Sequence, residues 1–212
     1  MKRHTLHALY VPGFQKDPEA VSKTEQIIEE LSPKFENQDW TIQASEACYG
    51  GEPSCKPISV YGEGLRREVE KLRPDAIIAH SMGVNEVRYA LHNLSFHFSG
   101  PIVFLEGPNA GAAPWKLWLT GFPLDRACVQ DMLKGSDFMK YMNMLESESN
   151  NFQILEIHGW LGEWWLSKDI FKKLPSSQLE IFPKVGHCEL PTDNEVVKTI
   201  LEFLNANIER VL

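Results

Sequence analysis

Short apolar runs alternate with helical patterns along nearly the whole chain, and this alternation limits the possible folds more than any other feature. The apolar runs cover residues 6–11, 40–47, 75–79, 101–105, 152–157 and 178–182. Helical spacing of apolar residues covers 18–31, just before Pro33, then 60–72, 82–94 and 192 to the C-terminus. Strands that alternate with helices are joined by right-handed crossovers, which produce parallel pairing. The pattern therefore predicts an α/β protein with a mostly parallel sheet of about six strands and helices on both faces.

One long segment interrupts this alternation. Residues 107–151 contain no clear strand but carry several tryptophan, phenylalanine and methionine side chains. Insertions at the carboxyl ends of parallel strands lie over the crevice where such sheets bind ligands. Because 212 residues suit one domain, we expect a single domain over residues 1–212, with 107–151 as a partial cap or lid.

Charge and composition exclude several classes of protein. The chain has 21 Lys and Arg against 29 Asp and Glu, a formal net charge of −8, which disfavours nucleic acid and anionic membranes as partners. No apolar run approaches the ~20 residues of a membrane span, and no signal-peptide pattern is present. The four cysteines have no CxxC spacing, and neither G-x-x-x-x-G-K-[ST] nor G-x-G-x-x-G follows the first strand. A cytoplasmic protein with no metal or organic cofactor is expected.

The strongest chemical signal is the pentapeptide AHSMG at 79–83, between an apolar run and a helical pattern. A serine on a sharp strand-to-helix turn presents its hydroxyl above the sheet, and small residues two places before and after it let the backbone turn tightly. The helix that follows points its free N–H groups and the positive end of its dipole at the same spot. Ser81 is therefore the candidate nucleophile.

A serine nucleophile needs a base that takes its proton. His187 is the candidate base, because it follows the last apolar run and lies in a loop before the final helical pattern. A carboxylate should hold the imidazole of that histidine in the right tautomer. Glu163 is the favoured carboxylate, since it comes shortly after the apolar run 152–157.

These motifs resemble those of the α/β-hydrolase superfamily, in particular its small lipase- and esterase-like serine hydrolases, and the resemblance runs from residue 4 to residue 212. AHSMG at 79–83 resembles the nucleophile elbow, and GHCELP at 186–191 resembles the loop of the catalytic histidine. Three further segments are similar to the oxyanion loop, to the turn after the next strand and to a helix start in small lipases: VPGF at 11–14, GPNAG at 107–111 and KGSDFMKYMN at 134–143. The resemblance implies an α/β-hydrolase fold and hydrolysis without a cofactor.

The resemblance also implies roles for individual residues. The backbone N–H groups of Phe14 and Met82 would bind the oxyanion, in a loop where the usual histidine-glycine pair is proline-glycine. Gly162 stands where the family usually has its aspartate, and Glu163 is one place later, within reach of a longer side chain. Glu106, at the end of the preceding strand, is the alternative acid, because some relatives place theirs there.

Two functions remain open on this sequence. The first is a serine hydrolase that cleaves a carboxylic ester, or a thioester or amide, through an acyl-enzyme on Ser81. Its substrate would be a small-molecule ester, and the aromatic and methionine content of 107–151 favours an apolar acyl group. The second is a catalytically weak or inactive α/β-hydrolase-like protein that binds a ligand or a protein, which the altered oxyanion loop and the displaced acid favour.

Overall fold

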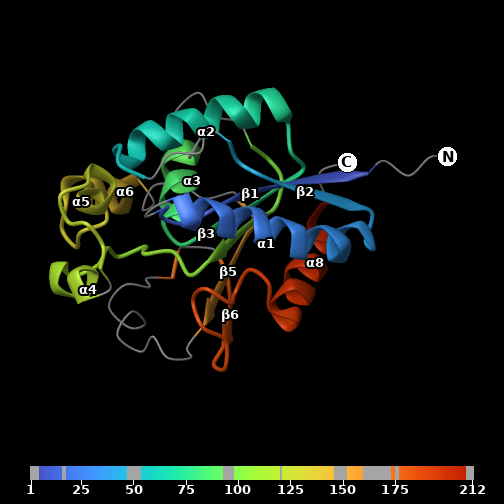
Figure 1. The fold of residues 1–212 in the computed structure, drawn as a ribbon. Coiled ribbons are helices and arrows are strands. Elements are labelled where there is room, and N and C mark those ends of the chain that lie inside the picture. Colours follow the sequence, from blue (N-terminus) through green and yellow to red (C-terminus); the bar gives the residue numbers. More distant parts are fainter. Residues whose placement is uncertain are drawn as a thin grey trace.

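Six parallel strands form a sheet in the computed structural model of the chain, in the order β2-β1-β3-β4-β5-β6 (Figure 1). The structure describes residues 5–15, 18–46, 54–92, 98–119, 121–145, 152–159, 173–174 and 177–208. The strands are β1 (Leu6–Val11), β2 (Trp40–Ala44), β3 (Ala76–His80), β4 (Ile102–Leu105), β5 (Ile154–Gly159) and β6 (Gln178–Phe182). The predicted number of strands and their parallel pairing are confirmed.

The strand order reverses between β1 and β3. The chain leaves β1 for the edge strand β2 and then returns to the other side of β1, where Val11 pairs with Ala79 of β3. Connections from the carboxyl ends of β1 and β3 therefore run in opposite directions, which leaves a crevice at that edge of the sheet. Ligands bind at this point in open α/β sheets, so the residues that follow β1 and β3 are the first place to look for a functional site.

Helices cover both faces of the sheet (Figure 1). One face carries α2 (Ile58–Leu72) and α3 (Met82–His92), and the other carries α1 (Pro18–Glu36) and α8 (Asn194–Ile208). Successive strand residues enter the two cores alternately: Leu9 and Val11 pack with α2 and α3, whereas Ala8 and Tyr10 pack with α1 and α8. All of these strand side chains are fully buried, as expected for a strand inside a sheet that is covered on both faces.

Helix α1 continues past the point at which its sequence pattern ends. Pro33 lies inside the helix, which runs on to Glu36. A proline has no N–H to bond the carbonyl four residues back, and it normally ends or kinks a helix. Burial explains the difference, because Phe35, one turn after Leu31, packs fully buried in the core beneath α1.

Three short helices, α4 (Pro114–Leu119), α5 (Ala127–Asp131) and α6 (Asp137–Leu145), lie at the end of the sheet where the strands terminate (Figure 1). They belong to the segment that the sequence predicts to form a partial cap. Asp131 in α5 accepts a hydrogen bond of 2.8 Å from the backbone N–H of Ile58, the first residue of α2, which joins this segment to the helix layer. None of the helices in the described ranges combines the length and apolarity needed to cross a membrane.

Candidate active site

Ser81 occupies the sharp turn between β3 and α3. It is the first residue after the strand, its backbone φ is +55°, and its N–H donates to the carbonyl oxygen of Leu105 in β4 over 2.9 Å. A left-handed backbone costs about 1–3 kcal/mol for a residue with a Cβ, and it persists only where the surrounding structure imposes it. The predicted serine therefore lies in a strained turn beside the point at which the strand order reverses.

Two glycines let the backbone close around this serine. A Cβ on Gly83 would lie 2.4 Å from the carbonyl oxygen of Pro12 and 2.6 Å from that of Val11, so the first turn of α3 rests on the backbone that follows β1. A Cβ on Gly13 would lie 2.8 Å from the Cβ of Ser81 and 3.4 Å from its Oγ. The loop after β1 therefore lies directly against the Ser81 side chain.

The predicted oxyanion donors come from the two elements that flank Ser81. Met82 begins α3 and is fully buried, and an N–H in the first turn of a helix has no acceptor within that helix. Phe14 follows Gly13 on the loop that lies against Ser81. Both predicted donors therefore lie on elements next to Ser81, and their role in binding an oxyanion stays a prediction.

Contacts from the α4–α6 segment hold the Phe14 loop in place. The rings of Phe14 and Phe122 stack with their centroids 4.8 Å apart, and the guanidinium carbon of Arg126 lies 5.5 Å from the Phe14 ring centroid. Arg126 also donates from Nη1 to the carbonyl oxygens of Ser54, at 3.0 Å, and Gln15, at 3.5 Å. The position of the Phe14 loop therefore depends on the segment that contains α5.

Gln15 ties the same loop to the body of the domain. It is buried, and its backbone N–H donates to the Oγ of Ser54 at 2.9 Å. Its side-chain amide donates to the Oγ1 of Thr24 at 2.9 Å and to the carbonyl oxygen of Gly13 at 3.4 Å. Sequence reasoning missed Gln15 and Arg126, because their partners are distant in the chain and no local motif marks them.

His187 and Glu106 meet at the carboxyl end of β4. The Nδ1 of His187 lies 3.0 Å from the Oε2 of Glu106, whose side chain is 2% exposed. Glu106 is the first residue after β4, and its N–H donates to the carbonyl oxygen of Ile157 in β5 over 2.9 Å. A carboxylate only accepts, so Nδ1 carries the hydrogen, and the Nε2 of the neutral ring carries the lone pair. This is the tautomer in which a histidine can take a proton from a serine hydroxyl.

The structure thus brings Glu106, the alternative acid, to the candidate base. Glu106 contacts His187, whereas Glu163 lies outside the described residues and its role stays a prediction. Because a single Nδ1–H needs a single acceptor, the observed contact favours Glu106 as the residue that orients the ring.

His80 joins the serine turn to the histidine loop. It is the last residue of β3 and 8% exposed, its Nε2 lies 3.0 Å from the carbonyl oxygen of His187, and the centroids of the two rings are 4.6 Å apart. Burial, together with the neighbouring His187, lowers the pKa of His80 well below its usual 6.5. The ring is therefore neutral at pH 7.

Other reactive groups fit the site less well. Burial raises the pKa of the Cys128 thiol to about 12, so this thiol stays protonated and is a poor nucleophile. Cys188 is exposed and adjoins His187, but it lies in a turn between β6 and α8, not at a strand-to-helix elbow. In the part of the chain that the structure describes, no group of three or more His, Cys, Asp or Glu side chains could hold a metal ion.

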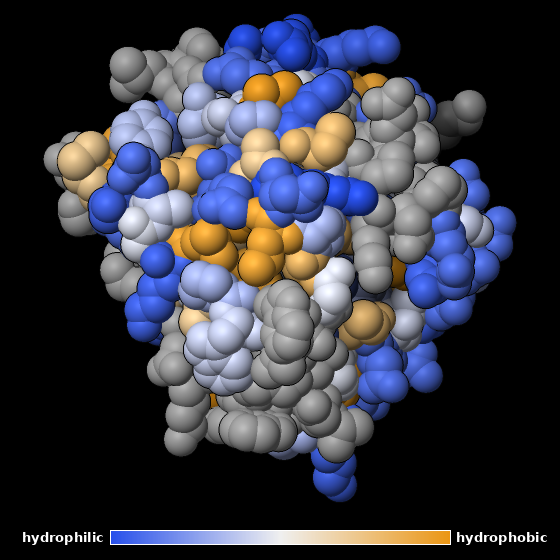
Figure 2. Space-filling model, turned by 60° about the vertical axis from the view of Figure 1, so that its left-hand side comes forward, coloured by the Kyte–Doolittle hydropathy of each residue, from blue (hydrophilic) through white to orange (hydrophobic). Residues whose placement is uncertain are grey.

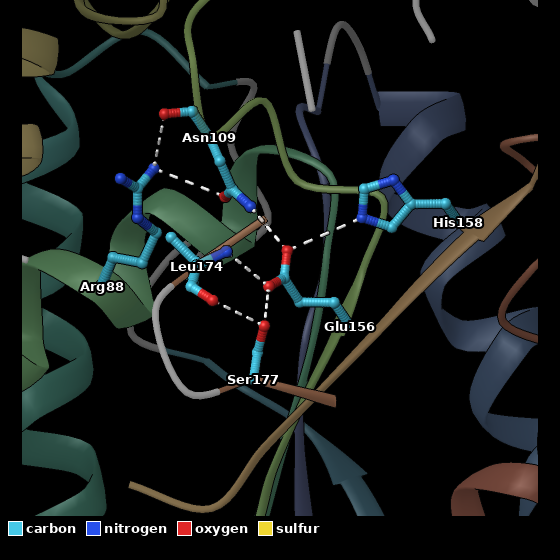
Figure 3. A network of polar contacts seen from close by, with 6 residues as sticks. All are labelled: Arg88, Asn109, Glu156, His158, Leu174 and Ser177. Carbon is cyan, nitrogen blue, oxygen red and sulfur yellow. Dashed lines mark hydrogen bonds and ion pairs between the residues drawn. The ribbon is translucent and has the colours of Figure 1, made fainter. Parts of the chain in front are cut away.

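Glu156 is the centre of a buried polar network (Figure 3). It lies fully buried in β5 and accepts hydrogen bonds from the Nδ2 of Asn109 at 3.0 Å, from the N–H of Leu174 at 2.7 Å and from the hydroxyl of Ser177. The Nε2 of His158 lies 3.7 Å from it. The sequence carried a signal for this residue, because a glutamate in the middle of a strand covered on both faces has no route to solvent.

Asn109 and Arg88 connect the network to the candidate site. The Nη1 of Arg88, in α3, donates to the Oδ1 of Asn85 at 2.6 Å and lies 3.4 Å from both the carbonyl oxygen and the Oδ1 of Asn109. Asn109 belongs to the turn that begins just after Glu106. The helix that follows Ser81 and the turn that follows Glu106 are therefore held together through buried hydrogen bonds.

Large apolar side chains are exposed at this end of the sheet. Trp115 in α4 is 57% exposed, and Tyr141 and Met144 in α6 are 45% and 55% exposed. Figure 2, which brings this side of the molecule forward, also shows hydrophobic residues in the middle of the face with hydrophilic residues around them; tryptophan and tyrosine are not hydrophobic on its colour scale, so this patch is separate from Trp115 and Tyr141. This end of the sheet therefore exposes apolar surface on α4 and α6.

The fold of the chain resembles that of solved proteins, although no protein-family model and no curated protein matches its sequence. A carboxylesterase from the thaumarchaeon Nitrososphaera gargenis is 12% identical, with a TM-score of 0.61 over 98% of this chain and 92% of its own. MenH from S. aureus is 15% identical, with a TM-score of 0.60 over 96% and 95%. A protein from Desulfitobacterium hafniense, provisionally assigned to the alpha/beta hydrolase family, is 13% identical, with a TM-score of 0.55 over 95% and 97%. At these identities the likeness shows the fold alone, and it is the fold predicted from the sequence.

Proposed function

We propose that this chain, which has the α/β-hydrolase fold, is a serine hydrolase that cleaves a carboxylic ester through an acyl-enzyme on Ser81. The observation that carries the proposal is the contact between the Nδ1 of His187 and Glu106, one strand away from a serine held in a strained strand-to-helix turn. The contact supplies an oriented base, and the turn supplies a nucleophile beside backbone donors.

The proposed reaction has two half-reactions. The Oγ of Ser81 attacks the carbonyl carbon of the ester while the Nε2 of His187 takes its proton, and the N–H groups of Phe14 and Met82 stabilise the oxyanion. The bond from the carbonyl carbon to the alcohol oxygen then breaks, and the proton on His187 goes to the departing alcohol. Water attacks the acyl-enzyme in the same way, losing a proton to His187, and the carboxylic acid leaves as Ser81 regains its proton.

Glu106 orients the ring of His187 and stabilises the imidazolium that forms in each half-reaction. Because the Glu106 side chain is almost completely buried, water and salt screen this interaction little. In this proposal Glu106, after β4, orients the histidine, a role for which the resemblance implies an acid after β5.

The substrate class that we propose is a small-molecule ester with an apolar acyl group. The support for this class is the group of exposed apolar side chains, Trp115, Tyr141 and Met144, at the same end of the sheet as Ser81. An acyl chain that covers such surface gains roughly 25 cal/mol for each Å² of apolar area removed from water.

Ester hydrolysis by the wild type and by Ser81→Ala tests the proposal, with p-nitrophenyl acetate, butyrate and octanoate as substrates. Ser81→Ala should lower kcat by roughly 10⁴-fold or more. Ser99→Ala, a change at an exposed serine in the loop before β4, is the matched control and should leave kcat unchanged. The rate should rise from acetate to octanoate. Full activity of Ser81→Ala would disprove the mechanism.

A fluorophosphonate probe separates a narrow substrate range from an inactive site. Such a probe labels a serine that is activated as a nucleophile, so it should label the wild type and Ser99→Ala but not Ser81→Ala. Labelling without turnover of the three esters would point to a different ester. Folded wild type that is not labelled would favour the alternative, a non-catalytic protein that binds a ligand or a protein.

A further inference from the structure

The ring of His80 makes a hydrogen bond to the main chain of His187, and the type of acceptor fixes which atom donates. Its Nε2 lies 3.0 Å from the backbone carbonyl oxygen of His187. A carbonyl oxygen only accepts, so the Nε2 of His80 must carry the hydrogen and donate it. The low pKa of His80 keeps the ring in this neutral, single-tautomer form at pH 7.

The loop that carries His187 is shaped by bonds within itself and by the core on which it rests. The N–H groups of Glu189 and Leu190 donate to the carbonyl oxygen of Gly186, and the N–H of Gly186 donates to the Oε2 of Glu189. These bonds set the form of the turn, and the buried side chains of Val185 and Leu190 fix its two ends on the core beside β5. His187 lies between these two ends with its side chain partly exposed, so its own contacts decide where its ring points.

Two contacts tie His187 to the strands that end beside it. Glu106, after β4, bonds the Nδ1 of the His187 ring, and His80, at the end of β3, bonds the His187 main chain. His80 is also covalently joined to Ser81, so its hydrogen bond acts directly between the serine turn and the histidine loop. The packing of the two rings at 4.6 Å supports the same alignment.

We infer that His80 is a positioning residue, which fixes the main chain of His187 so that its ring meets Ser81, and this inference rests on the proposed function. A neutral neighbour also suits the chemistry, because a charged His80 would repel the imidazolium that forms on His187. His80 itself is not the base, since its Nε2 is occupied as a donor to the loop.

A matched pair of variants at His80 tests the inference by ester hydrolysis. His80→Phe keeps a ring of similar shape but has no donor, whereas His80→Gln places an amide N–H at about the position of Nε2. His80→Phe should lower kcat about 10²-fold with little change in KM, because misplacement of a reacting group by about 1 Å costs this much. His80→Gln should recover most of that loss. Equal kcat values in His80→Phe and wild type, or in His80→Phe and His80→Gln, would overturn the inference.

A second readout does not depend on activity. In protein labelled with ¹⁵N-histidine, the Nδ1–H of His187 that bonds Glu106 should give a resolved proton signal, assigned by its loss in His187→Gln. The signal should persist in His80→Gln and broaden or vanish in His80→Phe, with His80→Leu as a substitute if the phenylalanine variant does not fold. An unchanged signal in the variant without a donor would overturn the inference. If Ser81→Ala kept full esterase activity, the proposed function would fail, while this signal would still decide whether His80 holds His187.

Discussion

Ser81 and Glu106 occupy equivalent positions one strand apart. Each is the first residue beyond its strand, and each has a left-handed backbone, with φ of +55° and +49°. Each donates its N–H to the next strand across the sheet, to Leu105 and Ile157 respectively, over 2.9 Å. The same local geometry therefore lifts both side chains from the carboxyl end of the sheet. The proposed nucleophile and the proposed acid are therefore positioned by adjacent parallel strands and not by long loops.

Glu106→Gln should lower kcat for ester hydrolysis by roughly 10²- to 10⁴-fold, the scale expected when a histidine loses its correct tautomer. The glutamine has nearly the same shape, but its amide group can donate to Nδ1, which stabilises the wrong tautomer. Steady-state kinetics with the best p-nitrophenyl ester would measure this loss.

Glu163→Gln is the matched control for that measurement, because Glu163 is the other acid that the sequence offers. It should leave kcat within a few-fold of the wild type. A large loss in Glu163→Gln together with a small loss in Glu106→Gln would reverse the assignment of the acid.

Ser81→Gly should be more stable than Ser81→Ala by about 1 kcal/mol, although neither should hydrolyse esters. Glycine adopts a left-handed backbone without the clash that a Cβ suffers, so it relieves the strain at φ of +55°. Urea unfolding would measure the difference. The neighbouring Ala79→Gly, in the buried strand β3, should instead destabilise the protein, and equal stabilities for Ser81→Gly and Ser81→Ala would contradict a strained turn.

His80 should make the protein less stable as the pH falls below about 6.5. The folded pKa of His80 lies well below the unfolded value of 6.5, so above pH 6.5 both states are neutral and the residue contributes nothing. Below that pH the unfolded chain binds a proton that the folded protein does not, and the free energy of unfolding falls by up to about 1.4 kcal/mol per pH unit until the folded pKa is reached.

His80→Gln isolates this contribution, because glutamine does not titrate. Between pH 7.5 and pH 5.5 the wild type should lose about 1.4 kcal/mol more of its free energy of unfolding than His80→Gln does. Urea unfolding at the two pH values would measure it. Parallel losses in the two proteins would show that His80 takes up its proton in the folded state at an ordinary pH.

Glu156→Ala should destabilise the protein by roughly 3 kcal/mol or more, because it leaves buried donors on Asn109, Leu174 and Ser177 without their acceptor. Glu180→Ala, at an exposed position on β6, should change the free energy of unfolding by no more than about 0.5 kcal/mol. Equal effects of the two substitutions in urea unfolding would mean that the buried network does not contribute to stability.

The strands and the order of the site motifs could be predicted from the sequence because both are local signals. A strand covered on both faces must be apolar, as AIIAH at 76–80 is, and a serine between such a strand and a helix marks the elbow. The choice between Glu106 and Glu163 could not be made in this way. It depends on the direction of the first side chain after β4, that of Glu106. The backbone of Glu106 is left-handed and its N–H bonds to β5. Neither feature can be recognised from composition or from the spacing of residues.

The residues that hold the candidate site in place could not be predicted either, because their contacts are not local in the sequence. Gln15 and Arg126 act through partners that are far away in the chain, and Pro33 is accommodated in α1 because the buried Phe35 outweighs a missing hydrogen bond. Glu156 was not predicted either, although it carried a local signal: a charged residue at the centre of an apolar run needs polar partners if it is buried.

The glycines beside Ser81 have a consequence for attempts to change this protein by random mutation. At Gly83 even a methyl group would meet the backbone oxygens of Pro12 and Val11, and at Gly13 it would meet Ser81 itself. Any other residue at these two positions therefore forces its neighbours to shift, whereas the exposed positions of α4 and α6 can vary without touching that contact. A library that keeps both glycines fixed and varies Trp115, Tyr141 and Met144 would search for changes in the proposed substrate preference while leaving the turn at Ser81 unchanged.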